Sequence, residues 1–234
     1  MEDFKNLINW HNLHKNSELF KKNKPFRFVF VEDFFVREFY EKLYETYPTI
    51  NSTWKIFSDL SKFQYYLPIL DNTHEVKQKI NPSDEKVTSL SEEWKKLLRY
   101  SVTDEFVDHF RRFSGVDVNK YKYFEFMAYQ KGGFQLPHIH NVGPSTLILM
   151  LYFSKGWKKG DPGGTYMASG LDEKAIIFEP YNLDNTLAIF HDGPHAAHGV
   201  RYIVKDVIRQ GLQITLENFS DSRWSGEKKS TINN

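Results

Sequence analysis

The sequence contains no cysteine. Disulfides, thiolate nucleophiles, zinc–thiolate sites and iron–sulfur clusters are therefore excluded, and any bound metal must take nitrogen or oxygen ligands. The chain also lacks an excess of either charge, because it contains 31 Lys and Arg residues and 30 Asp and Glu residues and so has a formal net charge of +1. This balance gives no global electrostatic reason to bind nucleic acid or an anionic membrane, and we expect neither partner.

Long apolar runs are missing as well. No stretch approaches the roughly 18 apolar residues of a membrane span. The first residues, Met1-Glu2-Asp3-Phe4, lack the basic region and apolar core of a signal peptide. We therefore expect a soluble, cytoplasmic protein. Aromatic residues, by contrast, are abundant: the 20 Phe, 13 Tyr and 5 Trp favour β-rich packing and sites that hold flat or apolar substrates.

The chain up to Gly115 combines one strand with several helices. Residues 25–31 alternate between apolar and polar side chains and predict a strand. The apolar residues of 34–43 recur at helical spacing, and Asp33 is a plausible N-cap for that helix. Capping chemistry at residues 89–94 begins a helical pattern that runs, with one break, to Ser114-Gly115.

Two stretches of this half are less regular. Residues 2–24 look helical in part and are polar enough to lie on a surface. Residues 49–84 carry scattered aromatic side chains and predict an irregular packed segment.

After Gly115 the pattern changes to many short strands separated by turns, which is typical of a sandwich or barrel rather than a parallel α/β sheet. Residues 146–153 are apolar throughout, as expected of a strand that is covered on both faces. The other expected strands are residues 121–129, 135–140, 165–168, 174–178, 186–190, 200–204 and 208–216. We expect a single domain over 1–234, with strand and helical support in 1–115, the β core in 116–222 and a loose polar tail in 223–234.

Five of the nine histidines lie in two stretches, residues 132–141 and 191–200. On a strand, His138 and His140 point to the same face, with their Cα atoms about 6.6 Å apart at roughly 3.3 Å per residue. A third imidazole from the later stretch would complete a facial set of ligands. The pattern predicts a metal centre, but imidazole suits iron, nickel, copper and zinc alike, so the ligands do not identify the metal.

The remaining histidines receive other interpretations. His191 and His195 are expected in loops at the entrance, with His195 as a reserve ligand. Ordinary surface positions are expected for His11, His14, His74 and His109.

Three features follow one another in a fixed order: His138-Ile139-His140, then His198-Gly199-Val200, then Arg209. This order resembles the 2-oxoglutarate and iron(II)-dependent oxygenases, in particular the prolyl-4-hydroxylase-like branch. That family carries a His-x-Asp pair on an early strand of a double-stranded β-helix, a later distal His, and an Arg about ten residues beyond it. Further resemblances lie at residues 25–39, 129–134, 160–164 and 185–190. His140 stands where the family has Asp.

The resemblance implies a mainly β fold with flanking helices, in which a double-stranded β-helix (a jelly roll, cupin-like) packs on an N-terminal helical layer. It implies that His138, His140 and His198 are the catalytic metal ligands and hold iron(II). Arg209, with Tyr129 or Tyr152 as partner because Gly211 replaces the family's usual serine, would bind the cosubstrate 2-oxoglutarate. With O2, such an enzyme hydroxylates a C–H bond of a small molecule or side chain and releases succinate and CO2.

The histidine at position 140 leaves alternatives open. His140 can replace the carboxylate as a ligand, or miss the metal and leave a position open, or mark a site that has lost its metal. Two other classes of protein stay possible: a three-histidine metal cupin (a dioxygenase independent of 2-oxoglutarate, or a sugar isomerase) and a non-catalytic jelly-roll binding protein. Substrate, type of oxidation and oligomeric state are open.

The sequence also suggests how Arg209 approaches the histidines. If the strands that carry His198 and Arg209 form a hairpin turning near Val204, the two residues become cross-strand neighbours about 5.5 Å apart.

Overall fold

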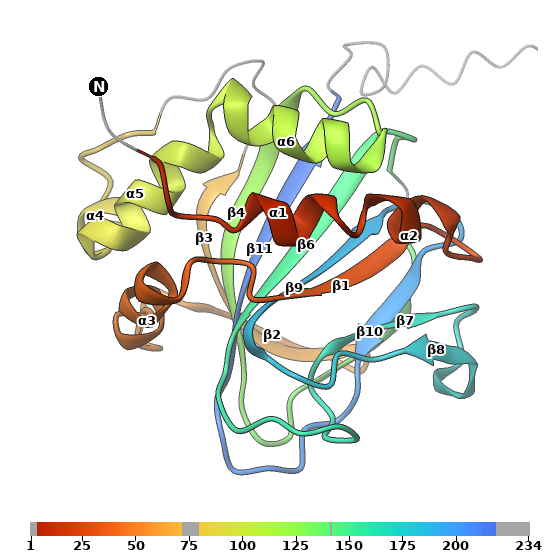
Figure 1. Cartoon of the computed structure of the whole chain (residues 1–234). Coiled ribbons are helices and arrows are strands. Elements are labelled where there is room, and N and C mark those ends of the chain that lie inside the picture. Colours follow the sequence, from red (N-terminus) through yellow and green to blue (C-terminus); the bar gives the residue numbers. More distant parts are fainter. Residues whose placement is uncertain (1–3, 72–79, 141, 219–234) are drawn as a thin grey trace, which may run out of the picture.

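A computed structural model describes residues 4–71, 80–140 and 142–218 of the chain, and shows one strongly curled antiparallel sheet with helices gathered on one side of it (Figure 1). The helices are α1 (Trp10–His14), α2 (Ser17–Lys22), α3 (Arg37–Glu45), α4 (Glu85–Thr88), α5 (Glu92–Ser101), α6 (Asp104–Ser114) and the 3-10 turn η1 (Glu173–Ala175). The strands are β1 (Phe28–Glu32), β2 (Lys55–Ser58), β3 (Lys62–Asp71), β4 (Lys120–Tyr129), β5 (Phe134–His138), β6 (Thr146–Phe153), β7 (Thr165–Ala168), β8 (Ile176–Phe178), β9 (Asp184–His191), β10 (Ala197–Val200) and β11 (Arg209–Glu217).

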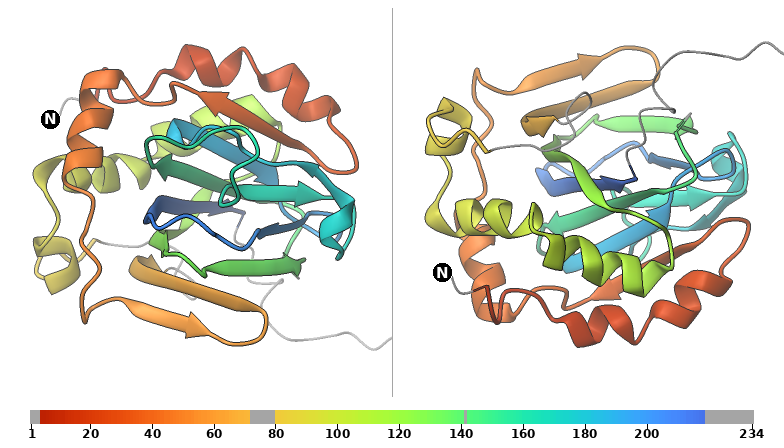
Figure 2. Two further views of the ribbon diagram at one scale, coloured as in Figure 1. Left: turned by 90° about the horizontal axis from the view of Figure 1, so that it is seen from below. Right: turned by 90° about the horizontal axis from the view of Figure 1, so that it is seen from above.

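Neighbouring strands in the sheet follow the order β1-β9-β6-β11-β4-β3-β5-β10-β7-β8, with β2 paired to β3 at the side. Strands distant in sequence are therefore adjacent in space, as β1 and β9 are, and the sheet curls into a half-barrel (Figure 2). This mainly β, jelly-roll architecture with a few helices confirms the predicted fold class.

The two faces of the sheet have different roles, and β6 shows the division. Its residues Leu147, Leu149 and Leu151 belong to the large core that packs against the helices. The alternate residues Ile148, Met150 and Tyr152 belong to a second core inside the curl. All eight residues of β6 are buried, which confirms that this strand is covered on both faces.

The helical predictions are largely confirmed. The Ser91 hydroxyl caps α5 by accepting a hydrogen bond from the Trp94 N–H, and α6 ends at Gly115, whose φ of 65° is left-handed. The expected N-cap Asp33 is wrong, since the residue preceding α3 is Val36. Asp33 instead has a φ of 51° and its carboxylate pairs with Arg37 at 3.1 Å.

Residues 49–84 were expected to be irregular, and this prediction is wrong. The segment contains the antiparallel pair β2–β3, which extends the sheet beside β4. Pro68 breaks the strand pattern in the sequence, and in the structure it lies at a register shift, where β-bulges accommodate proline. Within residues 2–24, α1 and α2 form as expected, although Leu13 and Phe20 are fully buried.

The strand expected at residues 200–204 is also misplaced, because β10 occupies Ala197–Val200. Consequently β10 and β11 form no hairpin with each other: β10 pairs with β5 and β7, while β11 pairs with β4 and β6. The cross-strand contact predicted between His198 and Arg209 is therefore wrong. The loose tail expected at 223–234 and the surface histidine His74 lie outside the described residues.

No helix in the described ranges combines the length and apolar character needed to cross a membrane.

Candidate metal centre

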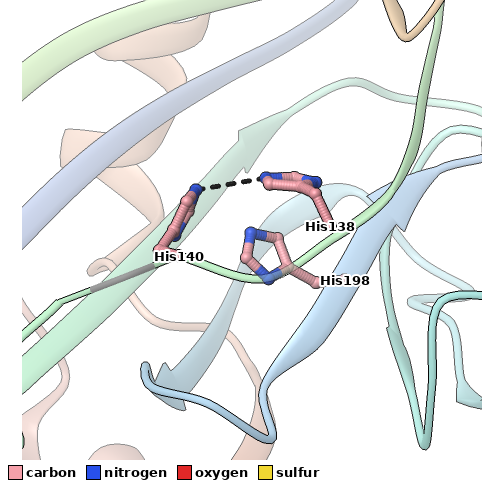
Figure 3. A group of neighbouring side chains, drawn as sticks. All are labelled: His138, His140 and His198. Carbon is pink, nitrogen blue, oxygen red and sulfur yellow. Dashed lines mark hydrogen bonds between the residues drawn. The ribbon is translucent and has the colours of Figure 1, made fainter.

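Three imidazole rings meet inside the curl of the sheet (Figure 3). His138 ends β5 and lies opposite His198 of β10 in the strand register. His140 was predicted to lie on the strand but lies two residues beyond the end of β5. Its ring nevertheless lies beside the rings of His138 and His198. The ring centroids of His138 and His198 are 4.3 Å apart, and each lies 4.8 Å from that of His140. One nitrogen from each ring lies within 4.8 Å of the others.

Hydrogen bonds fix the tautomer of each ring. The Nδ1 atom of His138 lies 3.1 Å from the Leu136 carbonyl oxygen, and that of His198 lies 2.7 Å from the Ala196 carbonyl oxygen. The Nδ1 atom of His140 lies 2.7 Å from the Asp192 carboxylate. Because these oxygens accept, the three Nδ1 atoms carry the proton, and the Nε2 atoms are left with lone pairs that can bind a metal. The Nε2 atom of His138 accepts a hydrogen bond from the Gln135 amide at 3.2 Å, a contact that a bound metal would replace.

The Nε2 atoms of His138 and His140 lie 3.1 Å apart (dashed line in Figure 3). With Nδ1 protonated in both rings, this contact brings two lone pairs together unless a cation stands between them. Burial, followed by the neighbouring imidazoles, lowers the pKa of His138 to about 4 and that of His198 well below its ordinary value. Both rings are thus neutral at pH 7, as metal ligands must be, and the donor set fits a divalent transition metal.

Asp192 is a residue of this site that the sequence analysis missed. It follows β9 directly, is 3% exposed, and holds His140 through one carboxylate oxygen while the other accepts the Gly193 N–H at 2.9 Å. A carboxylate that fixes the far nitrogen of a ligating histidine is a common outer partner in metal sites. The only signal in the sequence was its position within the second histidine stretch.

A cavity of about 140 Å³ opens from the three histidines into the curl. Its apolar wall contains Ile148, Met150 and Phe190, and the Phe190 ring lies 4.6 Å from that of His198. The other lining residues are Lys62, Glu125, Met127, Tyr129, Gln135, Thr165 and Gln213. The sequence analysis had given no role to Lys62, Glu125 or Gln213, since an alternating strand does not reveal which of its faces lines a cavity.

Arg209 is completely buried and contacts two residues of the cavity lining, Tyr129 and Thr165. Its guanidinium donates from Nε to the Gly163 carbonyl at 3.0 Å and from Nη2 to the Thr165 hydroxyl at 3.2 Å. The remaining nitrogen, Nη1, has no partner among the described residues, and no carboxylate there pairs with the group. A buried cation without a counter-ion is costly, so this guanidinium is suited to an anionic ligand.

The two tyrosines named with Arg209 contact it through their rings. The guanidinium carbon lies 5.0 Å from the ring centre of Tyr129 and 4.8 Å from that of Tyr152. The Tyr129 hydroxyl donates to the side chain of Gln64, and the Tyr152 hydroxyl accepts from the Thr165 N–H and also interacts with Arg209. A side chain at Gly211 would place its Cβ only 2.9 Å from Nη1, so glycine at this position leaves room for the guanidinium.

The other histidines lie apart from this centre. The Nε2 atom of His191 donates to the Pro144 carbonyl at 2.6 Å, and His195 is exposed on a turn. His11 is exposed as expected. The surface prediction is wrong for His14 and His109, which are half-buried and contact each other at 3.0 Å, with His109 stacked on Trp10 at 3.8 Å.

No protein-family model and no curated protein matches this sequence. Solved structures do match it, at low identity. A Pseudomonas putida prolyl-4-hydroxylase is 13% identical, with 89% of this chain and 100% of that chain covered at a TM-score of 0.62. A 2-oxoglutarate–Fe(II) oxygenase family oxidoreductase from Burkholderia pseudomallei is 11% identical, with 92% and 94% covered at 0.60. HygX from Streptomyces hygroscopicus, solved with nickel, 2-oxoglutarate and hygromycin B, is 11% identical, with 84% and 85% covered at 0.52.

Proposed function

We propose that this chain, which has the fold of the 2-oxoglutarate–Fe(II) oxygenases, is itself an iron(II)- and 2-oxoglutarate-dependent oxygenase that hydroxylates a substrate C–H bond. In this proposal His138, His140 and His198 hold the iron. Arg209 binds the distal carboxylate of 2-oxoglutarate, with the rings of Tyr129 and Tyr152 packed on either side of the guanidinium.

One observation carries the proposal: three imidazoles line a cavity, and a buried guanidinium, without a counter-ion among the described residues, contacts two other residues of the same lining. Tyr129 and Thr165 link the two, because both line the cavity and both contact Arg209. A metal alone would explain the histidines, and a carboxylate ligand alone would explain Arg209. A dicarboxylate that chelates the metal explains both.

The protein's own part in such a reaction is positioning. The Leu136, Ala196 and Asp192 oxygens hold the three imidazoles in one tautomer, so that their Nε2 atoms converge without rearrangement. When bound, the metal and cosubstrate would supply the oxidising chemistry, with one oxygen atom of O2 entering the substrate and the other entering succinate as CO2 leaves. The apolar wall of Ile148, Met150 and Phe190 excludes water from the place where a substrate C–H bond would lie.

The test is an anaerobic titration with iron(II) and 2-oxoglutarate that follows the weak visible charge-transfer band of the chelate. We expect the band only when both are present. Absence of the band with folded protein would contradict the proposal and favour a metal cupin, the class to which three histidine ligands also point. Such a cupin would need neither Arg209 nor 2-oxoglutarate.

The variant Arg209→Ala distinguishes the binding of 2-oxoglutarate from the binding of iron(II). We expect it to weaken 2-oxoglutarate binding roughly 10- to 100-fold, the effect of losing a charge-assisted bidentate contact, while iron(II) binding changes little. Calorimetric titration of each ligand measures both affinities. The matched control is Arg201→Ala, which removes an arginine that pairs with Glu179 away from the cavity. Equal loss of both affinities in Arg209→Ala would contradict the role assigned to Arg209.

A further inference from the structure

Two side chains of opposite charge line the cavity and are not used by the proposed metal and cosubstrate sites. Lys62 is the first residue of β3, and Glu125 lies in the middle of β4. Gln213 of β11 is the strand neighbour of Glu125 and lines the cavity beside it. Both charged residues are partly buried and belong to the lining of the cavity.

Neither charge is neutralised within the described ranges. No hydrogen bond or ion pair joins the Lys62 ammonium or the Glu125 carboxylate to another side chain there, and the two groups do not meet each other within the 4.0 Å of an ion pair. The Lys62 ammonium instead lies 4.4 Å from the ring centre of Phe57. A structural ion pair would bring the two charges into contact, since charges that are held apart lose hydration and gain less attraction than a contact pair does.

The pKa shifts of Glu125 and Lys62 are those expected of charged groups that lack a contact partner of opposite sign. Burial, followed by Asp71, raises the pKa of Glu125 to about 7, while Lys62 and Lys55 oppose the rise. Burial lowers the pKa of Lys62. Both pKa shifts have the same cause: burial disfavours the charged form of the side chain. A ligand with complementary charges would stabilise the charged forms of both Lys62 and Glu125.

We propose that Lys62 and Glu125 are the substrate-recognition pair, and that the substrate is a free α-amino acid with an aliphatic side chain. This inference rests on the proposed function. The substrate carboxylate would bind the Lys62 ammonium, and the substrate ammonium would bind Glu125, with Gln213 available as a further hydrogen-bond partner. The aliphatic side chain then lies along Ile148, Met150 and Phe190, beside the histidines.

Charge balance selects a zwitterion over a singly charged substrate. Lys62 and the ionised form of Glu125 bring one charge of each sign to the cavity lining, and a divalent metal would balance the two carboxylates of 2-oxoglutarate. A ligand with net charge would leave one charge uncompensated in a partly desolvated site, whereas a zwitterion leaves none.

The reaction then balances as follows: the amino acid, 2-oxoglutarate and O2 give the hydroxylated amino acid, succinate and CO2. One substrate C–H bond is replaced by C–OH. The oxidised carbon of the keto acid leaves as CO2, and the four electrons that reduce O2 come in equal shares from substrate and cosubstrate.

The experiment adds the free L-amino acids, one at a time, to protein with iron(II) and 2-oxoglutarate under anaerobic conditions. Binding is measured by calorimetry and by the shift of the charge-transfer band, and succinate is measured after O2 is admitted. We expect one or a few aliphatic amino acids to bind, to shift the band and to raise succinate formation above the level without substrate. Their N-acetyl and methyl-ester derivatives, which lack one charge each, should bind at least tenfold more weakly.

Two variants test the residues. Glu125→Gln and Lys62→Met should each weaken amino-acid binding at least tenfold while 2-oxoglutarate affinity stays within about twofold of the parent protein, because neither side chain has a hydrogen bond or ion pair with Arg209 or the three histidines among the described residues. Glu38→Gln and Lys174→Met, which alter exposed residues, are the matched controls.

The outcomes separate the two proposals. If the chelate band forms but no amino acid binds or raises succinate formation, the recognition pair is refuted and the oxygenase proposal stands. Unchanged binding in Glu125→Gln and Lys62→Met would likewise refute the pair. If the band never forms, the oxygenase proposal fails, and the calorimetric titrations of amino acids still decide whether the pair binds zwitterions.

Discussion

At the scale of single residues, the proposed centre differs from the usual two-histidine, one-carboxylate set by one unit of charge. An imidazole, that of His140, stands where the oxygenases that this chain resembles have Asp, and the Asp192 carboxylate contacts the far side of its ring at 2.7 Å. The Asp192 carboxylate therefore keeps a negative charge near the proposed metal position, but it would act on the metal only through the His140 imidazole. It makes His140 a stronger donor and fixes its orientation.

The variant Asp192→Asn tests this role. We expect it to weaken metal binding roughly 10- to 100-fold, the usual effect of removing an outer carboxylate partner of a ligating histidine. Competition with a metal chelator gives the affinity directly, without an activity assay. Asp172→Asn, which alters the exposed carboxylate that caps the 3-10 turn η1, is the control. Unchanged metal affinity in Asp192→Asn would show that His140 needs no such partner.

At the scale of elements, the end of α6 offers a clean measurement. Gly115 has a φ of 65°, and a Cβ there would approach nothing closer than Lys21 Cε at 3.8 Å. Gly115→Ala should therefore lower the free energy of unfolding by about 1–2 kcal/mol through backbone strain alone. Gly170→Ala, where a Cβ meets nothing within 4 Å and φ is ordinary, should be close to neutral. Urea unfolding of both variants measures the difference, and equal effects would remove the strain explanation.

The elements also show what the sequence could predict. The β6 strand, the capping of α5 and the glycine end of α6 were predictable because each depends on local pattern or local chemistry. The β2–β3 pair was missed because its polar residues Lys62 and Gln64 face inward, so the strand has no simple apolar face. Conversely, residues 201–204 have strand-like composition but form no strand, although Ile203 exchanges backbone hydrogen bonds with Gly132 and Gly133.

The residues of the candidate site likewise fall into those that the sequence could predict and those that it could not. The convergence of His138, His140 and His198 followed from their order in a recognised pattern. The short strand β10 carries His and Gly and has little strand propensity, so neither its partners nor the distance between His198 and Arg209 could be inferred locally. Asp192, Lys62 and Glu125 become neighbours of the site only through the curl of the sheet, which no local pattern encodes.

At the scale of the whole molecule, the stability of the unliganded protein should depend on pH through Glu125. Its pKa is raised from an ordinary 4.5 to about 7, chiefly by burial. The folded state therefore binds this proton more tightly than the unfolded state does. The contribution of Glu125 to the free energy of unfolding is fully present below pH 4.5 and is lost as the pH rises toward and through 7. Ionisation of Glu125 in the folded protein is unfavourable because the group is buried and close to Asp71, and the nearby Lys62 and Lys55 offset this only in part.

Glu125→Gln should consequently stabilise the free protein at pH 8, by as much as about 3 kcal/mol, and have little effect at pH 5. Urea unfolding at the two pH values measures the difference, with Glu38→Gln as an exposed control. The same gain at both pH values would mean that packing, and not ionisation, is responsible.

The pairing of β5 with β10 has a consequence for biosynthesis. His138 and His198 lie side by side in the sheet but sixty positions apart in the chain. At a translation rate of roughly 5–20 residues per second, the first imidazoles wait about 3 to 12 seconds for the third to be synthesised. A nascent chain therefore lacks the complete donor set until His198 has been synthesised, and the proposed centre can be loaded with metal only after that point.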